Sequence, residues 1–324
     1  MKQLRDTQIA IKEIKDFFEN RLAEELNLIR VSAPLFVKPE SGLNDNLTGK
    51  EKAVSFQMRK YGQNLEIVQS LAKWKRLALK WYKFKEYEGI YTDMDAIRPD
   101  EVLDATHSIY VDQWDWEKVI RKEDRNYDYL EKIVRSIFKV FKETEAYLEQ
   151  IYPGKWMKKL PEEITFISTQ ELEDMYPDKT AEERENLAVE KYKAIFVHQI
   201  GRPLKSGEKH DFRAPDYDDW DLNGDIIFWD PVLNSGLELS SMGIRVDEES
   251  LDRQLNMADA NNRRSLLYHQ ELLAGKLPYT VGGGIGQSRM CMFFLDKKHI
   301  GEVQASVWTE DVIEYSEKEN IFLL

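Results

Sequence analysis

The chain has 324 residues, and 59 acidic against 46 basic side chains give it a formal net charge of −13. Apolar residues make up 42% and charged residues 32% of the sequence, as is usual for globular proteins. Neutralising the phosphates of a nucleic acid requires clustered lysine and arginine, which this acidic balance disfavours. We therefore expect no nucleic acid as a standing partner, although a small anion could still bind locally.

The cysteine content and the hydropathy of the sequence indicate the cellular compartment of the protein. Cys291 is the single cysteine, which excludes a disulfide framework and a cysteine-based zinc cluster. No run approaches the ~18 apolar residues of a membrane span, and the first residues, MKQLRDTQIAIKEIKDFF, are amphipathic rather than signal-like. We expect a cytoplasmic protein without membrane association.

The first hundred residues are expected to hold helices and short strands. Helical spacing from Ile11 to Leu26 predicts a helix over 8–26. A strand over 26–37 follows, in which Pro34 is confined to an edge or an end because it donates no ladder bond. The pattern then predicts, in order, a polar loop over 40–52, a strand over 65–70 and a helix over 71–81.

The middle of the chain is expected to begin with two strands, over 88–97 and 107–116, joined by the loop RPDEVLDAT. Period-two alternation puts Gln113 and Asp115 on one face of the second strand. The pattern then predicts a helix over 117–150, a helix capped by Thr180 with Glu183, a strand over 194–200 and a charged loop over 201–220.

The last third is the most regular part of the sequence. Residues 225–246 read as a hairpin around the turn NSG, and a long helix runs from Leu251 to its end at Gly275. YTV, GGGIGQSR and MCMFFL then read as strand, glycine loop and helix. Strand-rich blocks with interspersed helices and no regular βα alternation predict an α+β fold with a mostly antiparallel sheet.

The glycine segment GGGIGQSR, residues 282–289, is the first candidate for chemistry. It lacks the Lys-Ser/Thr of a Walker loop and the glycine spacing of a dinucleotide-binding turn. Glycines would let another backbone or a flat ligand approach closely, and Arg289 on the first helical turn would favour an anion. A tight turn with a solvated arginine explains the same residues.

Two further candidates are an arginine and an acidic pair. Arg98 stands at the mouth of the strand–loop–strand, although a lone arginine there is usually a surface residue. Asp225 and Glu238 lie on the two arms of the hairpin among apolar neighbours, where carboxylates are costly without a cation. Oxygen ligands without His or Cys indicate magnesium rather than zinc. The sequence contains no HExxH or GxSxG motif.

These pieces together resemble the three ordered motifs of class II aminoacyl-tRNA synthetase catalytic domains: the helix and strand up to Pro34, the strand–loop–strand with Arg98, and the glycine segment ending at Arg289. Over residues 8–310 the chain looks like the asparagine synthetase A family, the ammonia-dependent aspartate–ammonia ligases. The resemblance is carried by DNLTGKEKAV, SLAKWKR, YVDQWDWE, HDFRAPDYDDW, NGDI, ELSSMGIRVD and GGGIGQSR.

The resemblance implies a homodimer in which residues 1–324 form one class II synthetase-like catalytic domain. The implied reaction joins L-aspartate and ammonia at the expense of ATP, through a β-aspartyl-adenylate, and releases AMP and pyrophosphate. It also implies a nucleotide site with magnesium held by Asp225 and Glu238. The implied nucleotide-binding residues are Arg98, Arg213, Glu238, Ser240, Gly284, Gly286 and Arg289.

For aspartate, the resemblance implies a site of mixed charge, with acids for the substrate ammonium and cations for its carboxylates. Arg245 is expected to bind one of these carboxylates as a bidentate fork. Asp45 is the candidate for binding ammonium and taking its proton, and with Arg98 and Arg289 it completes the implied catalytic set. The implied aspartate-binding residues are Ser70, Lys75, Gln113, Asp115, Asp218, Ser241 and Arg245.

Three other functions stay open on the sequence. A synthetase that transfers its adenylate to tRNA would share the motifs, although no segment is left for an anticodon-binding domain and the charge of −13 disfavours tRNA. A non-catalytic amino-acid sensor would be expected to lose the phosphate-binding arginines or the acidic pair. A magnesium-dependent hydrolase would leave the glycine segment unexplained.

Overall fold

The computed structural model describes residues 2–45, 47 and 51–324. The strands are β1 (Leu28–Arg30), β2 (Phe36–Val37), β3 (Ser55–Met58), β4 (Gln63–Ile67), β5 (Gly89–Ile97), β6 (Tyr110–Val119), β7 (Thr165–Ser168), β8 (Ala194–His198), β9 (Asp218–Asp230), β10 (Ser235–Arg245) and β11 (Thr280–Gly286). The α-helices are α1 (Lys2–Leu26), α2 (Ala72–Trp81), α3 (Tyr127–Ile151), α4 (Thr169–Met175), α5 (Ala181–Tyr192), α6 (Glu248–Met257), α7 (Leu267–Leu273), α8 (Gln287–Phe294) and α9 (Glu310–Lys318).

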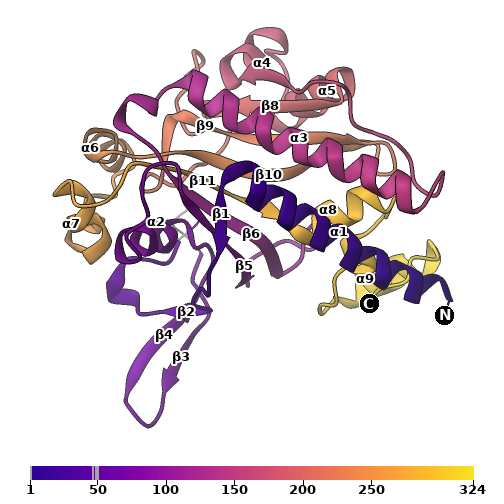
Figure 1. The fold of residues 1–324 in the computed structure, drawn as a ribbon, viewed down its shortest axis with the longest axis horizontal. Helices are drawn as coiled ribbons and strands as arrows, with labels where there is room; N and C mark the ends of the chain where they lie inside the picture. Colours follow the sequence, from indigo (N-terminus) through magenta and orange to yellow (C-terminus); the bar gives the residue numbers. More distant parts are fainter. Residues whose placement is uncertain (1, 46, 48–50) are drawn as a thin grey trace.

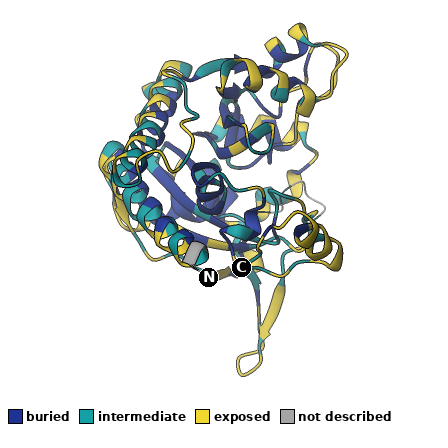
Figure 2. Ribbon diagram, turned by 90° about the vertical axis from the view of Figure 1, so that its right-hand side faces the viewer, coloured by how far each residue is buried: buried dark blue, intermediate teal, exposed yellow. Residues whose placement is uncertain are grey.

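An eight-stranded sheet in the order β1-β5-β6-β11-β10-β9-β8-β7 forms the centre of the molecule. Neighbouring strands of this sheet are antiparallel except at its two ends, where β1 pairs with β5 and β7 pairs with β8 in parallel. The predicted α+β fold with a mostly antiparallel sheet is therefore confirmed. A second sheet, β2-β4-β3, carries a hairpin that projects from the body and is largely exposed (Figures 1 and 2).

The two faces of the central sheet differ in chemistry. The helices α1 and α3 run side by side across one face (Figure 1), where they bury Trp114 and Trp116 of β6 in the main apolar core. Because side chains alternate along a strand, Gln113, Asp115 and Glu117 point to the other face. That polar face lies at the centre of the sheet, where the pocket described below forms. None of the helices in the described part of the chain combines the length and hydropathy that crossing a bilayer requires.

The structure corrects two predictions in the first half of the chain. The single strand over 26–37 is two strands in different sheets, with Pro34 in the gap between β1 and β2. The helix predicted over 117–150 begins only at Tyr127, because 117–119 continue β6 and the Asn126 side chain caps the helix by accepting from Tyr129 N at 2.9 Å.

Two predictions in the last third were also wrong. The long helix ending at Gly275 is two helices, α6 and α7, since Asp259 adopts a left-handed conformation (φ 51°) after α6. The segment GGGIG is not a loop but part of β11, because β6 and β10 form ladders with it on both sides. Tertiary pairing here overrides the low strand propensity of glycine.

Candidate active site

A cavity of about 470 Å³ opens over the polar face of β6, β10 and β11, a volume typical of small-molecule sites. Loops 98–109 and 211–217 and the helix α2 complete its wall. Except for Asp225, the structure places every residue of the predicted site in its lining: Asp45, Ser70, Lys75, Arg98, Gln113, Asp115, Arg213, Asp218, Glu238, Ser240, Ser241, Arg245, Gly284, Gly286 and Arg289.

The glycines of β11 make room for polar side chains on the neighbouring strands. A Cβ on Gly284 would lie 2.4 Å from Gln113 Oε1 and 2.7 Å from Asp115 Oδ1. A Cβ on Gly282 would lie 2.0 Å from Glu117 Oε2. Gly282 and Gly284 thus leave space on this face of β11, into which the side chains of β6 extend.

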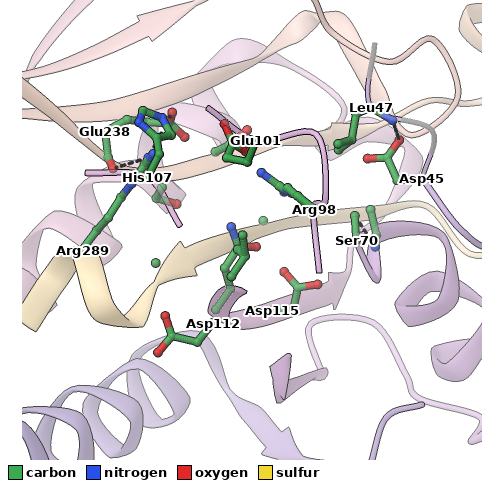
Figure 3. Close-up of a pocket in the computed structure, with 18 of the residues that line it drawn as sticks. Asp45, Leu47, Ser70, Arg98, Glu101, His107, Asp112, Asp115, Glu238 and Arg289 are labelled. Carbon is green, nitrogen blue, oxygen red and sulfur yellow. Dashed lines mark hydrogen bonds and ion pairs between the residues drawn. The ribbon is translucent and has the colours of Figure 1, made fainter. Parts of the chain in front are cut away.

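Asp45, Leu47 and Ser70 lie at one end of the cavity (Figure 3). The Asp45 side chain is buried, and its Oδ1 accepts from Leu47 N at 3.0 Å. Burial raises the pKa of Asp45, and the positive charges of Lys73 and Arg98 partly offset this rise. A buried carboxyl with a raised pKa suits proton transfer near neutral pH better than an ordinary aspartate.

Gln69, which the sequence analysis did not select, joins Asp45 to Arg98. Its Nε2 donates to the Asp45 carbonyl at 2.8 Å, and its own carbonyl accepts from Arg98 Nη2 at 3.4 Å. Asn44 Oδ1 accepts from Gln69 N at 2.9 Å and from Asp45 N at 3.0 Å. This network fixes the backbone from which the Asp45 carboxylate extends.

Lys75 of α2 faces Asp115 of β6 in the middle of the cavity. The Lys75 Nζ lies 3.3 Å from Asp115 Oδ1 and donates to the Gly283 carbonyl at 3.0 Å. Burial lowers the pKa of Lys75, although the Asp115 charge opposes this effect. An amine and a carboxylate side by side can meet the two signs of charge that an amino acid presents.

Arg245 lies beside them and is paired with two carboxylates. Its Nε is 3.0 Å from Glu117 Oε1, its Nη2 is 2.7 Å from Glu117 Oε2, and its Nη1 donates to Asp218. From the sequence, Arg245 was expected to bind a substrate carboxylate with two parallel N–H donors, such as this Nε and Nη2 edge. The structure instead turns that edge to Glu117, which leaves the remaining Nη hydrogens for a ligand.

Arg213 holds Asp225 behind the far wall of the cavity. Its Nη2 donates to both Asp225 oxygens at 2.7 Å, and its Nη1 donates to Ser241 Oγ. Burial, with a contribution from the Glu238 charge, raises the pKa of Asp225 to about 7 despite the guanidinium. Asp225 and Glu238 are therefore close enough to interact, as the hairpin predicted.

The acidic pair Asp225 and Glu238 has the chemistry of a magnesium site. Among the described residues, no group of three or more His, Cys, Asp and Glu side chains could hold a metal ion. Protein-bound Mg²⁺ commonly takes only one or two carboxylates and completes its shell with phosphates and water. Oxygen donors on neighbouring strands, of which Glu238 lines the cavity, fit such a shared site.

Arg98, Arg289 and His107 bring positive or ionisable nitrogen to the other part of the cavity (Figure 3). Arg289 lies on the first turn of α8. Its guanidinium donates to the Glu238 carbonyl at 3.1 Å and to the Thr106 carbonyl at 3.3 Å. His107 Nδ1 lies 2.8 Å from Asp104 Oδ1. His107 also lines the cavity, although it was not selected from the sequence.

Three donor atoms on residues that line the cavity are buried without a hydrogen-bond partner in the described part of the chain. They are Arg98 Nε, Arg213 Nε and Ser240 Oγ. Buried polar groups are nearly always paired in native proteins. The lining combines three arginines, Arg98, Arg213 and Arg289, with the carboxylate of Glu238, an arrangement that suits a metal-bound polyphosphate.

Sequence comparison shows one family over nearly the whole chain: residues 5–320 match the aspartate–ammonia ligase family. The aspartate–ammonia ligase of Clostridium tetani is 62% identical over 322 residues, which cover 99% of this chain and 94% of that protein. The Fusobacterium nucleatum aspartate–ammonia ligase is 65% identical over 319 residues, covering 98% and 97% of the two chains.

Comparison with solved structures shows the fold. Asparaginyl-tRNA synthetase of Entamoeba histolytica, in complex with asparaginyl-adenylate, superposes with a TM-score of 0.66 at 14% identity. The match covers 93% of this chain and 66% of the synthetase. The Pyrococcus horikoshii asparaginyl-tRNA synthetase gives 0.65 at 15% identity, over 92% and 68% of the two chains. The central sheet is thus that of class II synthetase catalytic domains, as predicted.

Proposed function

This chain belongs to the aspartate–ammonia ligase family, and on that premise we propose which residues of the cavity carry each step of the reaction. The established activity of the family is the ammonia-dependent synthesis of asparagine, a ligase reaction that forms a carbon–nitrogen bond. A carboxylate resists nucleophiles, so the side chain of aspartate has to be activated. We propose that ATP does this by adenylation, which makes AMP the leaving group when ammonia attacks.

The phosphates of ATP are assigned to the arginines. Arg98 contacts the α-phosphate, Arg289 the outer phosphates, and Arg213 with Ser240 adds further donors. The observation that carries this assignment is that Arg98, Arg213, Arg289 and Ser240 line the same cavity. Donors placed before the reaction stabilise the charge that develops on the phosphoryl oxygens.

Magnesium would be held by Asp225 and Glu238 together with the nucleotide. When bound, it neutralises phosphate charge and orients the leaving pyrophosphate. Arg213 Nη2 donates to both Asp225 oxygens at 2.7 Å and fixes the orientation of that carboxylate. The backbones of Gly284 and Gly286 allow close approach of the nucleotide.

Aspartate is assigned to the mixed-charge middle of the cavity. Asp115 and Asp218 accept from its ammonium, with Ser70, Gln113 and Ser241 as polar partners. Lys75 and the free Nη hydrogens of Arg245 bind its carboxylates. Because both cations are already paired with buried acids, they are positioned before substrate arrives.

Ammonia is assigned to the Asp45 end. Ammonia is mostly protonated at neutral pH, so attack requires an acceptor for its proton. Asp45 is buried and lies across the cavity from Arg289, with Arg98 between them (Figure 3). The Asp45 carboxylate would bind ammonium and take its proton, and the neutral amine would attack the adenylate.

The decisive experiment supplies aspartate, ATP and magnesium, with or without ammonium chloride, and measures AMP and asparagine together. Equal amounts of AMP and asparagine that depend on ammonium would support the adenylate route. Formation of ADP in place of AMP would exclude it. Pyrophosphate exchange without asparagine would favour transfer to tRNA, and aspartate binding without turnover would favour a sensor.

We further propose a homodimer of single-domain subunits that meet through α1 and β1. β1 is an edge strand of the central sheet, and Ile9 and Ile29 on these elements are 47% and 62% exposed. Apolar side chains along an open edge favour burial against another chain. A monomeric mass in light scattering at micromolar concentration would reject this arrangement. A cytoplasmic location stays a prediction from the single, buried Cys291.

A further inference from the structure

A cluster of buried charged side chains lies behind the cavity, outside its lining. Asp216 is fully buried, and its Oδ2 accepts from three side chains on three elements. The donors are Lys73 Nζ of α2 at 3.1 Å, Arg263 Nη1 of the 3-10 helix over Asn261–Ser265 at 2.9 Å, and His269 Nε2 of α7 at 2.9 Å. None of these four residues is used by the reaction assigned above.

The charges of this cluster do not balance within it. Burial lowers the pKa of His269, so the imidazole is neutral and donates its Nε2–H to Asp216. Lys73 and Arg263 therefore face a single carboxylate. Asp45 supplies a second carboxylate. Burial has the largest effect on the pKa of Asp45, and the next largest effects come from the charge of Lys73, which lowers it, and that of Asp216, which raises it.

The same elements hold both carboxylates in place. Asp216 is followed directly by Tyr217 and Asp218, which line the cavity. A Cβ on Gly42, at the start of the Asp45 loop, would lie only 2.7 Å from the Leu266 Cβ. The loop of Asp45 therefore packs tightly against the segment that carries Arg263 and His269.

We propose that Lys73 and Asp216 are positioning residues for ammonium capture: Asp216 holds the Lys73 amine at 3.1 Å, which keeps that amine from pairing with Asp45 and leaves the Asp45 carboxylate for ammonium. This inference rests on the proposed role of Asp45. Ammonium then meets a free carboxylate instead of one already neutralised by lysine. Among the described residues, Arg98, on the cavity side, and the Tyr217 hydroxyl also interact with the Asp45 carboxylate.

Two substitutions of this pair should shift the pKa of Asp45 in opposite directions. Lys73→Met removes the positive charge and should raise it. Asp216→Asn removes a like charge, leaves Lys73 free to act on Asp45, and should lower it. A nearby charge typically moves a pKa by about one unit or more. A merely structural role would instead move both variants in the same direction.

The kinetic test measures asparagine formation against ammonium concentration and pH, with ATP and aspartate saturating. In Lys73→Met the pH profile of the ammonium KM should move about one unit higher, so that the KM rises on the acidic side of the profile and recovers at higher pH. In Asp216→Asn it should also rise, because Lys73 now competes with ammonium, but raising the pH should not restore it. Aspartate-dependent ATP–pyrophosphate exchange should stay close to wild type in both.

Lys80→Met is the matched control. Lys80 lies on the same helix and pairs with Glu271 of α7, but at the surface. This variant should change neither the ammonium KM nor its pH dependence. If Asp216→Asn fails to fold, the Lys73→Met/Asp216→Asn double variant replaces it, since removing both partners of a buried pair costs less than removing one. The pKa of Asp45 should be lower in the double variant than in Lys73→Met.

Carbon-13 NMR of protein labelled at aspartate Cγ separates this inference from the assigned function. The Asp45 signal is identified by its loss in Asp45→Asn, and its titration is followed without substrates. Opposite shifts in the two variants, matched by the ammonium kinetics, support the proposal. Equal or absent shifts overturn it while leaving the role of Asp45 to its own test. Opposite shifts without any change in ammonium KM overturn it together with the assignment of ammonium to Asp45.

Discussion

Arg245 and Glu117 form a two-point contact beneath the cavity, with Arg245 Nε 3.0 Å from Oε1 and Arg245 Nη2 2.7 Å from Oε2. Thr280 Oγ1 donates to the same carboxylate at 2.7 Å. Burial alone would raise the pKa of Glu117, but the guanidinium reverses this and lowers it. Glu117 thereby decides which hydrogens of Arg245 remain for a substrate carboxylate.

Glu117→Gln should therefore weaken aspartate binding by about tenfold or more and destabilise the fold by about 3 kcal/mol, because it removes one of the two carboxylates that pair with a buried guanidinium. Calorimetric titration with aspartate and denaturant unfolding measure the two effects. Glu86→Gln is the control, since it breaks the exposed pair with Arg121 at 2.7 Å, where we expect less than about 1 kcal/mol. Unchanged aspartate affinity in Glu117→Gln would contradict the role assigned to Arg245.

The glycines of β11 should differ in their tolerance of a side chain. Gly284→Ala places a Cβ within 2.7 Å of Asp115 Oδ1 and should lower both thermal stability and aspartate affinity. Gly286→Ala brings the Cβ no closer than 3.4 Å to Arg289 Cβ, and Gly286 has an ordinary φ of −65°. Its melting temperature should stay near that of the wild type. Equal losses of stability in the two variants would show that the β11 backbone, rather than these contacts, is limiting.

The face of a residue was easier to predict than the state of its side chain. Period two placed Gln113 and Asp115 on one face, and both line the cavity. Hairpin spacing brought Asp225 and Glu238 near each other. In contrast, Arg245 was expected to face substrate, and its forked edge faces Glu117. That pairing joins residues 128 positions apart, so no local pattern could reveal it.

The errors in the fold have the same origin. A triple glycine reads as a loop until the strands on both sides are known, and β6 and β10 supply ladder bonds from distant parts of the chain. Gln69 and Asp216 went without a role because their importance lies in contacts made across elements. A buried polar residue cannot be told from a solvated one by its neighbours in sequence.

Asp45→Asn should separate the two halves of the reaction. The amide cannot accept a proton from ammonium, so asparagine formation should fall by about 100-fold, a usual contribution of general base catalysis. ATP–pyrophosphate exchange that depends on aspartate should persist, since the arginines and the aspartate site remain. Asp178→Asn, an exposed position, serves as the control. Loss of both activities would move Asp45 into aspartate binding.

Buried histidines should make the fold sensitive to mild acid. Burial lowers the pKa of His198, His269 and His299 below the usual 6.5. The unfolded chain then binds more protons than the folded one between 6.5 and these lower values, so the free energy of unfolding should decrease as pH falls through that window, by up to about 1.4 kcal/mol per pH unit for each histidine. Guanidinium unfolding at pH 7.5 and 5.5 measures the loss. His269→Gln, which keeps a donor for Asp216, should be less stable than wild type at pH 7.5 but should lose less on acidification. An equal loss in the variant would show that His269 titrates alike in both states.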